Sequence, residues 1–404
     1  KKKKKTPDQV KKLSFFGIDF GTSALSSYLG LSRDANLEGL ISENSLNKII
    51  NTSLNIYFFF KNKLNTKKYV VYLYNGRHSE YRPIVRLCKN LKINCFILEF
   101  CGDGEKNIGI QEFRNHLPTD LKPMKNLLNN FWKKKKNRKN KCDYYFKYKR
   151  AGRVINDRAS YILKQNKNLL PYSWDDSKIN IVYFTSSQDE YFTLGDEYDK
   201  TVYKHQNDSI KKIINSLKKI KKKDIHLYIR VHPYLEKVFW KFNREIEKLH
   251  DPENNIFVIP PGSKISSYKM MSKSNKVITY NSQTGIEAVY WKKPSILLGR
   301  RIYEDFKCCY IPKNHNHVMK LLLKKNLKPK SISNIGALKY AAFWVLGGLS
   351  FRYFQGSMKN GYKFKNKKLK FRVADFFIYS LGKFIQYYIY NYLINFKLSK
   401  IKSK

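Results

Sequence analysis

The chain has 404 residues, which is enough for two α/β domains that each bury a core of their own. Its 80 Lys and Arg residues against 31 Asp and Glu give a formal net charge of +49, which favours an anionic partner. A compositional bias toward Lys, Asn, Ile, Tyr and Phe explains the excess equally well. The basic residues are scattered rather than gathered beside aromatic platforms, which argues against a specific nucleic-acid module.

The six cysteines and the apolar segments indicate a protein of a reducing cytosol that does not cross a membrane. No CxxC pair occurs, and no cysteine lies at a zinc-ligand spacing from a histidine, so no metal site is predicted. Residues 1–12 lead into only a brief apolar stretch, so we expect no signal peptide, although the start lacks Met and looks truncated. Residues 340–351 form the longest apolar window and fall short of the roughly 18 residues of a spanning helix.

The first half of the chain predicts a βαβ unit. Residues 69–74 are rich in β-branched and aromatic side chains and stop at Asn75-Gly76-Arg77. Residues 83–91 follow with helical periodicity, and residues 94–98 resume strand character. The very basic residues 133–153 predict an exposed loop or a segment beside a hinge. We therefore expect an N-terminal Rossmann-like domain over residues 1–172.

The second half predicts a parallel, doubly wound sheet, because strands and helices alternate. The predicted strands cover residues 179–184, 225–231, 256–259, 276–280 and 295–298. A helix with an apolar stripe from Ile210 to Ile220 follows the first strand, and another helix covers residues 285–291. Ligands bind at the carboxyl ends of the strands of such sheets. We therefore expect a second Rossmann-like domain, with a ligand site at its strand ends, over residues 173–330.

Arg230 and His232 close the second strand of that sheet. A guanidinium and an imidazole at a strand end suit a phosphate or diphosphate, and Pro233 stops the strand there. The alternative is that His232 only hydrogen-bonds a neighbouring loop.

Residues 281–287 follow another strand and open a helix, so their backbone N–H groups form an anion site. Ser282 and Thr284 add hydroxyl donors. Thr284 and Glu287 also have the spacing of a capping box, which needs no ligand. Glu287 is alternatively placed to accept a hydrogen bond from a ribose hydroxyl.

Taken in order, these segments resemble the capsule polysaccharide biosynthesis family of glycosyltransferases. The resemblance covers roughly residues 15–355. It rests on residues 17–21 (GIDFG), 75–77 (NGR), 184–190 (FTSSQDE), 229–233 (IRVHP), 265–268 (ISSY) and 280–288 (YNSQTGIEA), with Lys293-Pro294 after them.

The resemblance implies a GT-B fold of two Rossmann-like domains with parallel sheets, in which C-terminal helices return to the first domain. It makes residues 1–172 the acceptor domain and residues 173–330 the nucleotide-sugar (donor) domain. It implies sugar transfer without a bound metal or other cofactor, from a CMP- or UDP-linked donor to a glycan or lipid-linked glycan. The related Kdo- and sialyltransferases contact the donor through residues that match His232, Ser186, Ser187, Ser282 and Thr284. The chain lacks an Asp-x-Asp metal motif at a strand end, in agreement with this expectation.

A transferase must also deprotonate its acceptor, which needs a carboxylate or histidine facing the cleft. Position alone makes Asp19, in the glycine-flanked segment, a candidate base. Glu99 and Asp103, at the end of the strand over residues 94–98, are the others. Each could equally be a turn former or a helix cap.

The last part of the chain, residues 331–404, predicts a helical extension rich in aromatic and basic residues. Residues 340–354 and 371–396 are its expected helices. They either pack back on the first domain or lie at an anionic membrane surface, with aromatic rings at headgroup level. The second alternative would make the protein peripheral at the inner face of the membrane.

Other functions fit the same patterns. A UDP-sugar 2-epimerase of the same fold shares the His-Pro strand end and would need no acceptor. A glycerophosphotransferase is a second alternative, and a non-catalytic basic protein that binds anionic glycan, lipid or nucleic acid is a third.

Overall fold

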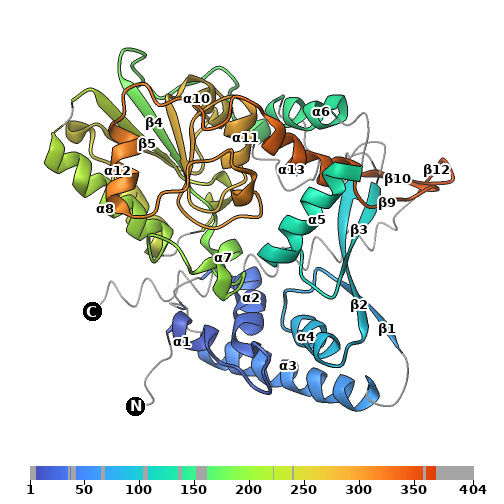
Figure 1. Ribbon diagram of the computed structural model, residues 1–404. Helices are drawn as coiled ribbons and strands as arrows, with labels where there is room; N and C mark the ends of the chain where they lie inside the picture. The colour runs from blue at the N-terminus through green and yellow to red at the C-terminus, as the bar shows by residue number, and fades with distance from the viewer. Residues whose placement is uncertain are drawn as a thin grey trace, which may run out of the picture.

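The computed structural model of the chain describes residues 6–34, 37, 42–64, 69–102, 108–134, 139–151, 162–221, 223–238, 241–357 and 361–369. Figure 1 shows a parallel sheet at the upper left and a mixed sheet at the right, with α7 and α13 between them. The fold is of the α/β class, as the sequence predicts.

The elements of the first half are α1 (Pro7–Lys11), α2 (Phe20–Ser32), α3 (Ser42–Leu64), β1 (Val70–Tyr74), α4 (Arg82–Asn90), β2 (Asn94–Gly102), β3 (Ile108–Arg114), α5 (Leu121–Lys134) and α6 (Lys139–Arg150). Those of the second half are β4 (Ile179–Phe184), α7 (Gln188–Tyr191), α8 (Gln206–Ile220), β5 (Ile225–Arg230), α9 (Lys241–Glu247), β6 (Ile256–Ile259), α10 (Ser267–Lys273), β7 (Lys276–Thr279), α11 (Thr284–Tyr290), β8 (Ser295–Leu297) and α12 (His315–Leu323). The chain then adds α13 (Ile335–Leu346), β9 (Leu349–Ser350), β10 (Phe354–Ser357), β11 (Gly361–Phe364) and β12 (Lys367–Lys368).

The second half forms a five-stranded sheet with the order β6-β5-β4-β7-β8, and all its neighbouring strands are parallel. Its strand bounds agree with the predicted ones to within a residue. Every residue of β4 to β8 is buried, as expected for a sheet that helices cover on both faces. The strand order reverses between β4 and β7, so a crevice opens at the carboxyl ends of these two strands.

The first half forms a mixed sheet with the order β1-β2-β3-β9. The predicted βαβ unit is present, since β1 and β2 are parallel and α4 connects them. The next two strands differ from the parallel pattern, because β3 and β9 both pair antiparallel. One face of β1 is solvent-exposed at Val70, Tyr72 and Tyr74, which a partly antiparallel sheet tolerates.

The part of the chain that forms α13 and β9 returns to the first half, as the predicted GT-B architecture requires. Helix α13 contacts α5, α6 and β2, and β9 completes the first sheet. Ala337, Tyr340, Ala341 and Phe343 of α13 are buried, so this helix is a packing element. The helix expected over residues 340–354 ends earlier, at Gly347-Gly348, and the chain continues as strands. The helix expected over residues 371–396 lies outside the described residues.

The basic segment over residues 133–153 is not the loop that its charge predicts. Helix α6 occupies most of its described part and buries Cys142, Tyr145, Phe146 and Tyr148. Their spacing is a helical stripe, and this stripe packs on α13 while the lysines between face outward. The density of Lys and Asn obscured that periodicity.

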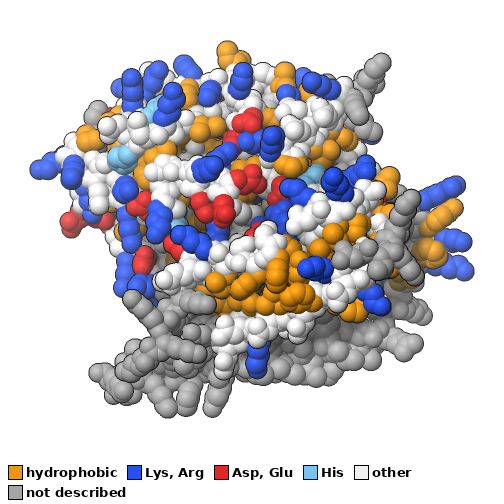
Figure 2. Space-filling model, turned by 60° about the horizontal axis from the view of Figure 1, so that its bottom comes forward, with side chains coloured by type: hydrophobic (Ala, Val, Ile, Leu, Met, Phe, Trp, Pro, Cys, Tyr) orange, Lys and Arg blue, Asp and Glu red, His pale blue; other side chains and the backbone are white. Residues whose placement is uncertain are grey.

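The basic residues are scattered over the surface. Figure 2 shows Lys and Arg side chains over most of the described face, with acidic side chains among them and a continuous hydrophobic area below. Among the described residues, none of the helices is sufficiently long and apolar to span a membrane.

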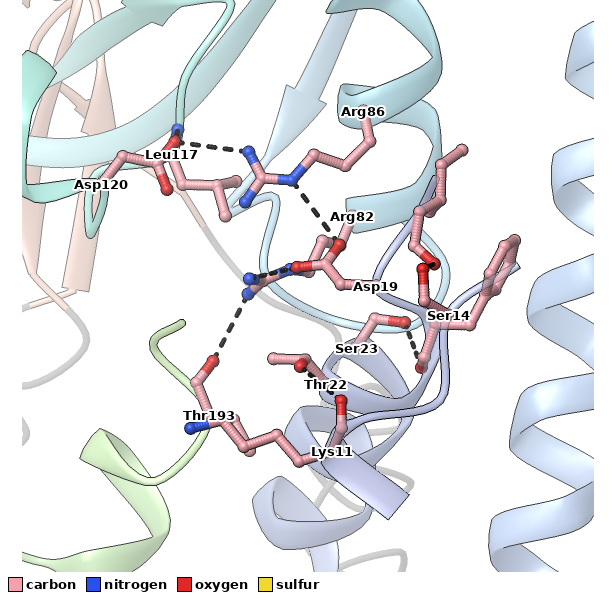
Figure 3. A network of polar contacts seen from close by, with 12 residues as sticks. Lys11, Ser14, Asp19, Thr22, Ser23, Arg82, Arg86, Leu117, Asp120 and Thr193 are labelled. Carbon is pink, nitrogen blue, oxygen red and sulfur yellow. Dashed lines mark hydrogen bonds and ion pairs between the residues drawn. The ribbon is translucent and has the colours of Figure 1, made fainter. Parts of the chain in front are cut away.

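A buried ion pair connects the beginning of the chain to both halves (Figure 3). Arg82 of α4 is 1% exposed, and its Nη2 and Nε lie 2.6 and 2.8 Å from Oδ2 of Asp19. Its Nη1 also donates to the carbonyl of Thr193 in the second half, at 3.3 Å. Burial alone would raise the pKa of Asp19, but Arg82 and then Arg86 outweigh burial and hold this pKa below its usual value.

We expect Arg82→Met to destabilise the protein by about 3 kcal/mol, because it leaves the Asp19 carboxylate without its main partner. Calorimetry would show this as a lower melting temperature. Arg114→Gln, at an exposed position of β3, is the matched control and should change stability by less than about 0.5 kcal/mol. Equal melting temperatures for both variants would contradict a structural role for Arg82.

Candidate functional site

A cavity of about 1020 Å³ lies at the crevice of the parallel sheet and is lined by both halves of the chain. The second half contributes all seven residues predicted to bind the donor: Ser186, Ser187, Arg230, His232, Ser282, Thr284 and Glu287. The first half contributes, among others, residues from α2 and from the segment before α4. The structure therefore brings together strand ends that are up to a hundred residues apart in the sequence.

The ends of three strands are joined by hydrogen bonds at the floor of the cavity. Thr185 Oγ1, after β4, accepts from the backbone N–H of His232 after β5, at 2.9 Å. Ser186 Oγ accepts from the backbone N–H of Asn281 after β7, at 3.3 Å. Ser186 N–H in turn donates to Gln206 of α8 at 2.6 Å. The small hydroxyl residues thus fix the spacing between the strand ends, besides lining the cavity.

Arg230 is 1% exposed and shapes the wall of the cavity through backbone carbonyls. Its Nη1 donates to Pro260 and to Val231, and its Nη2 donates to Ser263 at 3.4 Å. Its Nε lies 3.3 Å from Ser267 Oγ, at the first residue of α10. The guanidinium therefore holds the loop between β6 and α10 in place, and adds positive charge beside the cavity.

His232 is neutral at ordinary pH. Burial and then Arg230 lower the pKa of its imidazole to about 4. Its Nδ1 accepts from the backbone N–H of Tyr234 at 3.2 Å, so the proton of the neutral ring is on Nε2. His232 can therefore donate a hydrogen bond from Nε2, but it does not supply a positive charge.

The predicted capping box of Thr284 and Glu287 is not formed, and this prediction was wrong. Helix α11 has Gln283 as its N-cap, and no side chain caps it. Thr284 Oγ1 instead accepts from Ser282 Oγ at 2.9 Å. Glu287 is taken by other partners, since Lys149 of α6 lies 2.8 Å from its Oε1 and Tyr268 donates to its Oε2 at 2.8 Å. Both oxygens of Glu287 therefore have protein partners, which leaves it poorly placed to bind a ribose hydroxyl.

Two ion pairs cross the cavity between the halves. Lys149 pairs with Glu287, and Arg33 after α2 pairs with Asp189 of α7. Asp189 also accepts from Ser187. Burial raises the pKa of Asp189, while Arg33 opposes that rise. Each pair neutralises a buried charge, so these four groups hold the halves together more than they attract a ligand.

Two of the three predicted catalytic carboxylates, Asp19 and Glu99, are not among the residues that line the cavity. Asp19 is bound by Arg82 and Arg86, and Glu99 of β2 accepts from Asn75 Nδ2 at 2.7 Å. Asp103 lies outside the described residues. Four other carboxylates line the cavity: Glu80, Asp189, Glu190 and Glu287.

Sequence reasoning missed the contribution of residues 77–80, all of which line the cavity. The signal was present, because Asn75-Gly76 ends a strand. Both residues have a left-handed backbone, and a Cβ at Gly76 would lie 2.8 Å from Leu117. This turn directs His78, Ser79 and Glu80 toward the strand ends of the other half. Within the described parts of the chain, no group of His, Cys, Asp and Glu side chains could hold a metal ion.

We expect the imidazole of His232 to titrate with a midpoint near pH 4, because burial and Arg230 disfavour its charged form. The unfolded chain takes up this proton near pH 6.5, so the stability that His232 contributes is present above pH 6.5 and is lost as the pH falls toward 4. NMR titration of the imidazole signals, assigned by comparison with His232→Gln, would test this. A midpoint near 6.5 would place the ring in water instead.

The comparison with protein families finds one match, over residues 124–306, to the model described as capsule polysaccharide biosynthesis protein. No curated protein matches the sequence.

Among solved structures, a β-Kdo 2,4-transferase KpsC of Thermosulfurimonas dismutans is similar, with 15% identity over 67% of this chain and 78% of that one, and a TM-score of 0.41. A β-Kdo 2,7-transferase KpsC of the same organism has 16% identity over 81% and 96%, and a TM-score of 0.38. The UDP-GlcNAc 2-epimerase of Methanocaldococcus jannaschii, in complex with UDP-GlcNAc and UDP, has 12% identity over 71% and 78%, and a TM-score of 0.32. These likenesses are distant, and no activity follows from them. The family match includes the strands β4, β5 and β7, whose carboxyl ends form the floor of the cavity, so this part of the chain is similar to capsule polysaccharide biosynthesis proteins.

Proposed function

We propose that the protein is a glycosyltransferase that moves a sugar from a nucleotide-sugar donor to a capsule or other surface-polysaccharide acceptor. The observation that carries the proposal is the single cavity wall on which all seven predicted donor residues meet, at the point where the strand order of a parallel sheet reverses. The cavity has the volume needed for a nucleotide sugar together with part of an acceptor.

The donor would bind against the second half. Ser186, Ser187, Ser282 and Thr284 supply hydroxyls there, and His232 supplies a neutral N–H donor. Hydrogen-bond donors that the fold holds in place stabilise a departing phosphate without having to reorient during the reaction. Arg230 adds charge and fixes the neighbouring loop. The acceptor would enter from the first half, where α2 and residues 77–80 form the opposite wall.

We propose Glu80 as the base that deprotonates the acceptor hydroxyl. It is a cavity carboxylate contributed by the first half, opposite the donor wall. Its Oε2 accepts from Ser79 Oγ at 2.9 Å and from Ser27 Oγ at 3.2 Å, which orients the carboxylate. Asp189 and Glu287 are committed to Arg33 and Lys149.

Glu80→Gln should lower kcat by about 10²- to 10⁴-fold with little change in KM for the donor, because it removes a proton acceptor and preserves the shape of the side chain. Steady-state transfer assays would measure both constants. Glu112→Gln, at an exposed position of β3, is the control and should retain full activity. An unchanged kcat in Glu80→Gln would reject this residue as the base.

Nucleotide binding tests the site itself. We expect one of CMP, UDP, GDP and CDP to raise the melting temperature of the unmodified protein, and the rise to disappear in His232→Ala and in the double variant Ser282→Ala with Thr284→Ala. His250→Ala and Ser272→Ala, which lie outside the cavity, should keep it. If the folded protein responds to none of the four nucleotides, the transferase proposal fails and a non-catalytic binding protein replaces it. Product analysis with the matching nucleotide sugar then separates transfer from epimerisation.

A further inference from the structure

Arg301 is a cavity cation that has no acidic partner within the described part of the chain. It follows β8 and lines the cavity. Its Nε is buried and lacks a hydrogen-bond partner among the described residues, and no ion pair joins it to a carboxylate there. Its electrostatic neighbours are three tyrosines, Tyr340, Tyr198 and Tyr303, with Glu190 as the weakest influence. Two other cavity cations, Arg33 and Lys149, each pair with a carboxylate, and a third, Arg230, donates to backbone carbonyls.

The preceding residue, Arg300, is an arginine with a structural role in the same turn. Arg300 donates from Nε and Nη2 to the carboxylate of Glu304 at 2.6 to 3.0 Å, and from Nη1 to a backbone carbonyl. Glu304 is also bound by Lys125. The two carboxylates of this turn thus have other partners, since Glu304 is bound by Arg300 and Lys125, and Asp305 pairs with Lys125 at 3.0 Å. The Glu304 carboxylate contacts Arg301 only at its backbone, where the Arg301 N–H donates to Oε2 at 3.1 Å.

The backbone holds Arg301 at the cavity on both sides. Gly299 approaches β7 so closely that a Cβ there would lie 2.3 Å from the carbonyl oxygen of Tyr280. Tyr303 donates to the carbonyl of Ser282 at 2.6 Å, which ties the turn to the donor wall. The fold thus fixes the backbone of Arg301 at the edge of the cavity.

A second donor without a partner lines the same cavity. Trp344 of α13 has its indole Nε1 buried, and no acceptor for it occurs among the described residues. Its ring lies 6.2 Å from that of Tyr340, which is also a neighbour of Arg301. A buried donor that lacks an acceptor is destabilising, so these two donors beside Tyr340 indicate that something else supplies the acceptor.

We infer that Arg301 and Trp344 form an oxyanion subsite that binds a negatively charged group of the substrate. A guanidinium and an indole N–H are donors only, so their ligand must be an acceptor, and a carboxylate or phosphate fits the planar guanidinium with two parallel hydrogen bonds. The inference rests on the proposed function, since it assigns the anion to the nucleotide sugar. Two sources share this chemistry: the phosphate of the nucleotide, and a carboxylate on the transferred sugar.

Calorimetric titration of the unmodified protein, Arg301→Gln, Trp344→Phe and the control Arg114→Gln would test the subsite. The ligands are CMP, UDP, UDP-glucose and UDP-glucuronic acid, with inorganic phosphate and glucuronate as nucleotide-free probes. We expect Arg301→Gln to weaken binding of at least one anion by tenfold or more and Trp344→Phe to weaken it less, since charged hydrogen bonds are the stronger ones. Arg114→Gln should bind like the unmodified protein. Arg301→Lys, which keeps the charge and loses the paired geometry, serves if Arg301→Gln does not fold.

The pattern of losses identifies the source. A loss for CMP, UDP and both UDP-sugars assigns the subsite to phosphate, whereas a loss confined to UDP-glucuronic acid and glucuronate assigns it to a carboxylate. If the unmodified protein binds nucleotides and the Arg301 and Trp344 variants bind every ligand equally well, the subsite is rejected and the proposed function stands. If no nucleotide binds at all, the proposed function fails. Phosphate and glucuronate then still test the subsite, and it is rejected if they bind equally well to all variants or bind to none.

Discussion

The buried guanidinium of Arg82 is the contact on which the arrangement of the two halves depends. Arg82 belongs to helix α4 and pairs with Asp19 at the beginning of α2. It also donates to the backbone carbonyl of Thr193 in the second half. A charge that is 1% exposed is costly unless it is fully paired, so the three segments are held in one geometry. Residues 77–80 immediately precede this anchor, and their position in the cavity follows from it. The site is therefore built on an ionic connection between halves as much as on the sheet.

The charges in the cavity divide into two groups with different consequences. Arg33 and Lys149 reach across from the first half and are neutralised by Asp189 and Glu287, so they act as clamps. The donor wall itself carries hydroxyls and a neutral imidazole, with Arg230 turned to backbone carbonyls. An overall charge of +49 therefore says little about the site, because most of its cations are already paired.

The second half could be predicted closely from the sequence, because five buried strands with polar ends leave an unmistakable pattern, and those ends gave the residues of the donor wall. The first half was harder. The Asp103-Gly104 pair between β2 and β3 is a turn signal that was overlooked, and β9 comes from residues far along the chain. The partners of individual side chains could not be predicted from the sequence either, because the ion pair of Lys149 with Glu287 depends on two helices that meet in space. The same limit explains why position in the sequence drew attention to Asp19 and Glu99, and why Glu80 was overlooked.

The return of α13 and β9 to the first half has a consequence for biosynthesis. The parallel sheet uses residues 179–297 and can assemble as soon as they have left the ribosome. The mixed sheet cannot be completed until Leu349 and Ser350 of β9 have been synthesised. Helices α5 and α6 likewise lack their packing partner until α13 has been synthesised. The first half is thus synthesised first but completed last. Until α13 covers it, its apolar surface is exposed, and such a surface makes a nascent chain prone to aggregation.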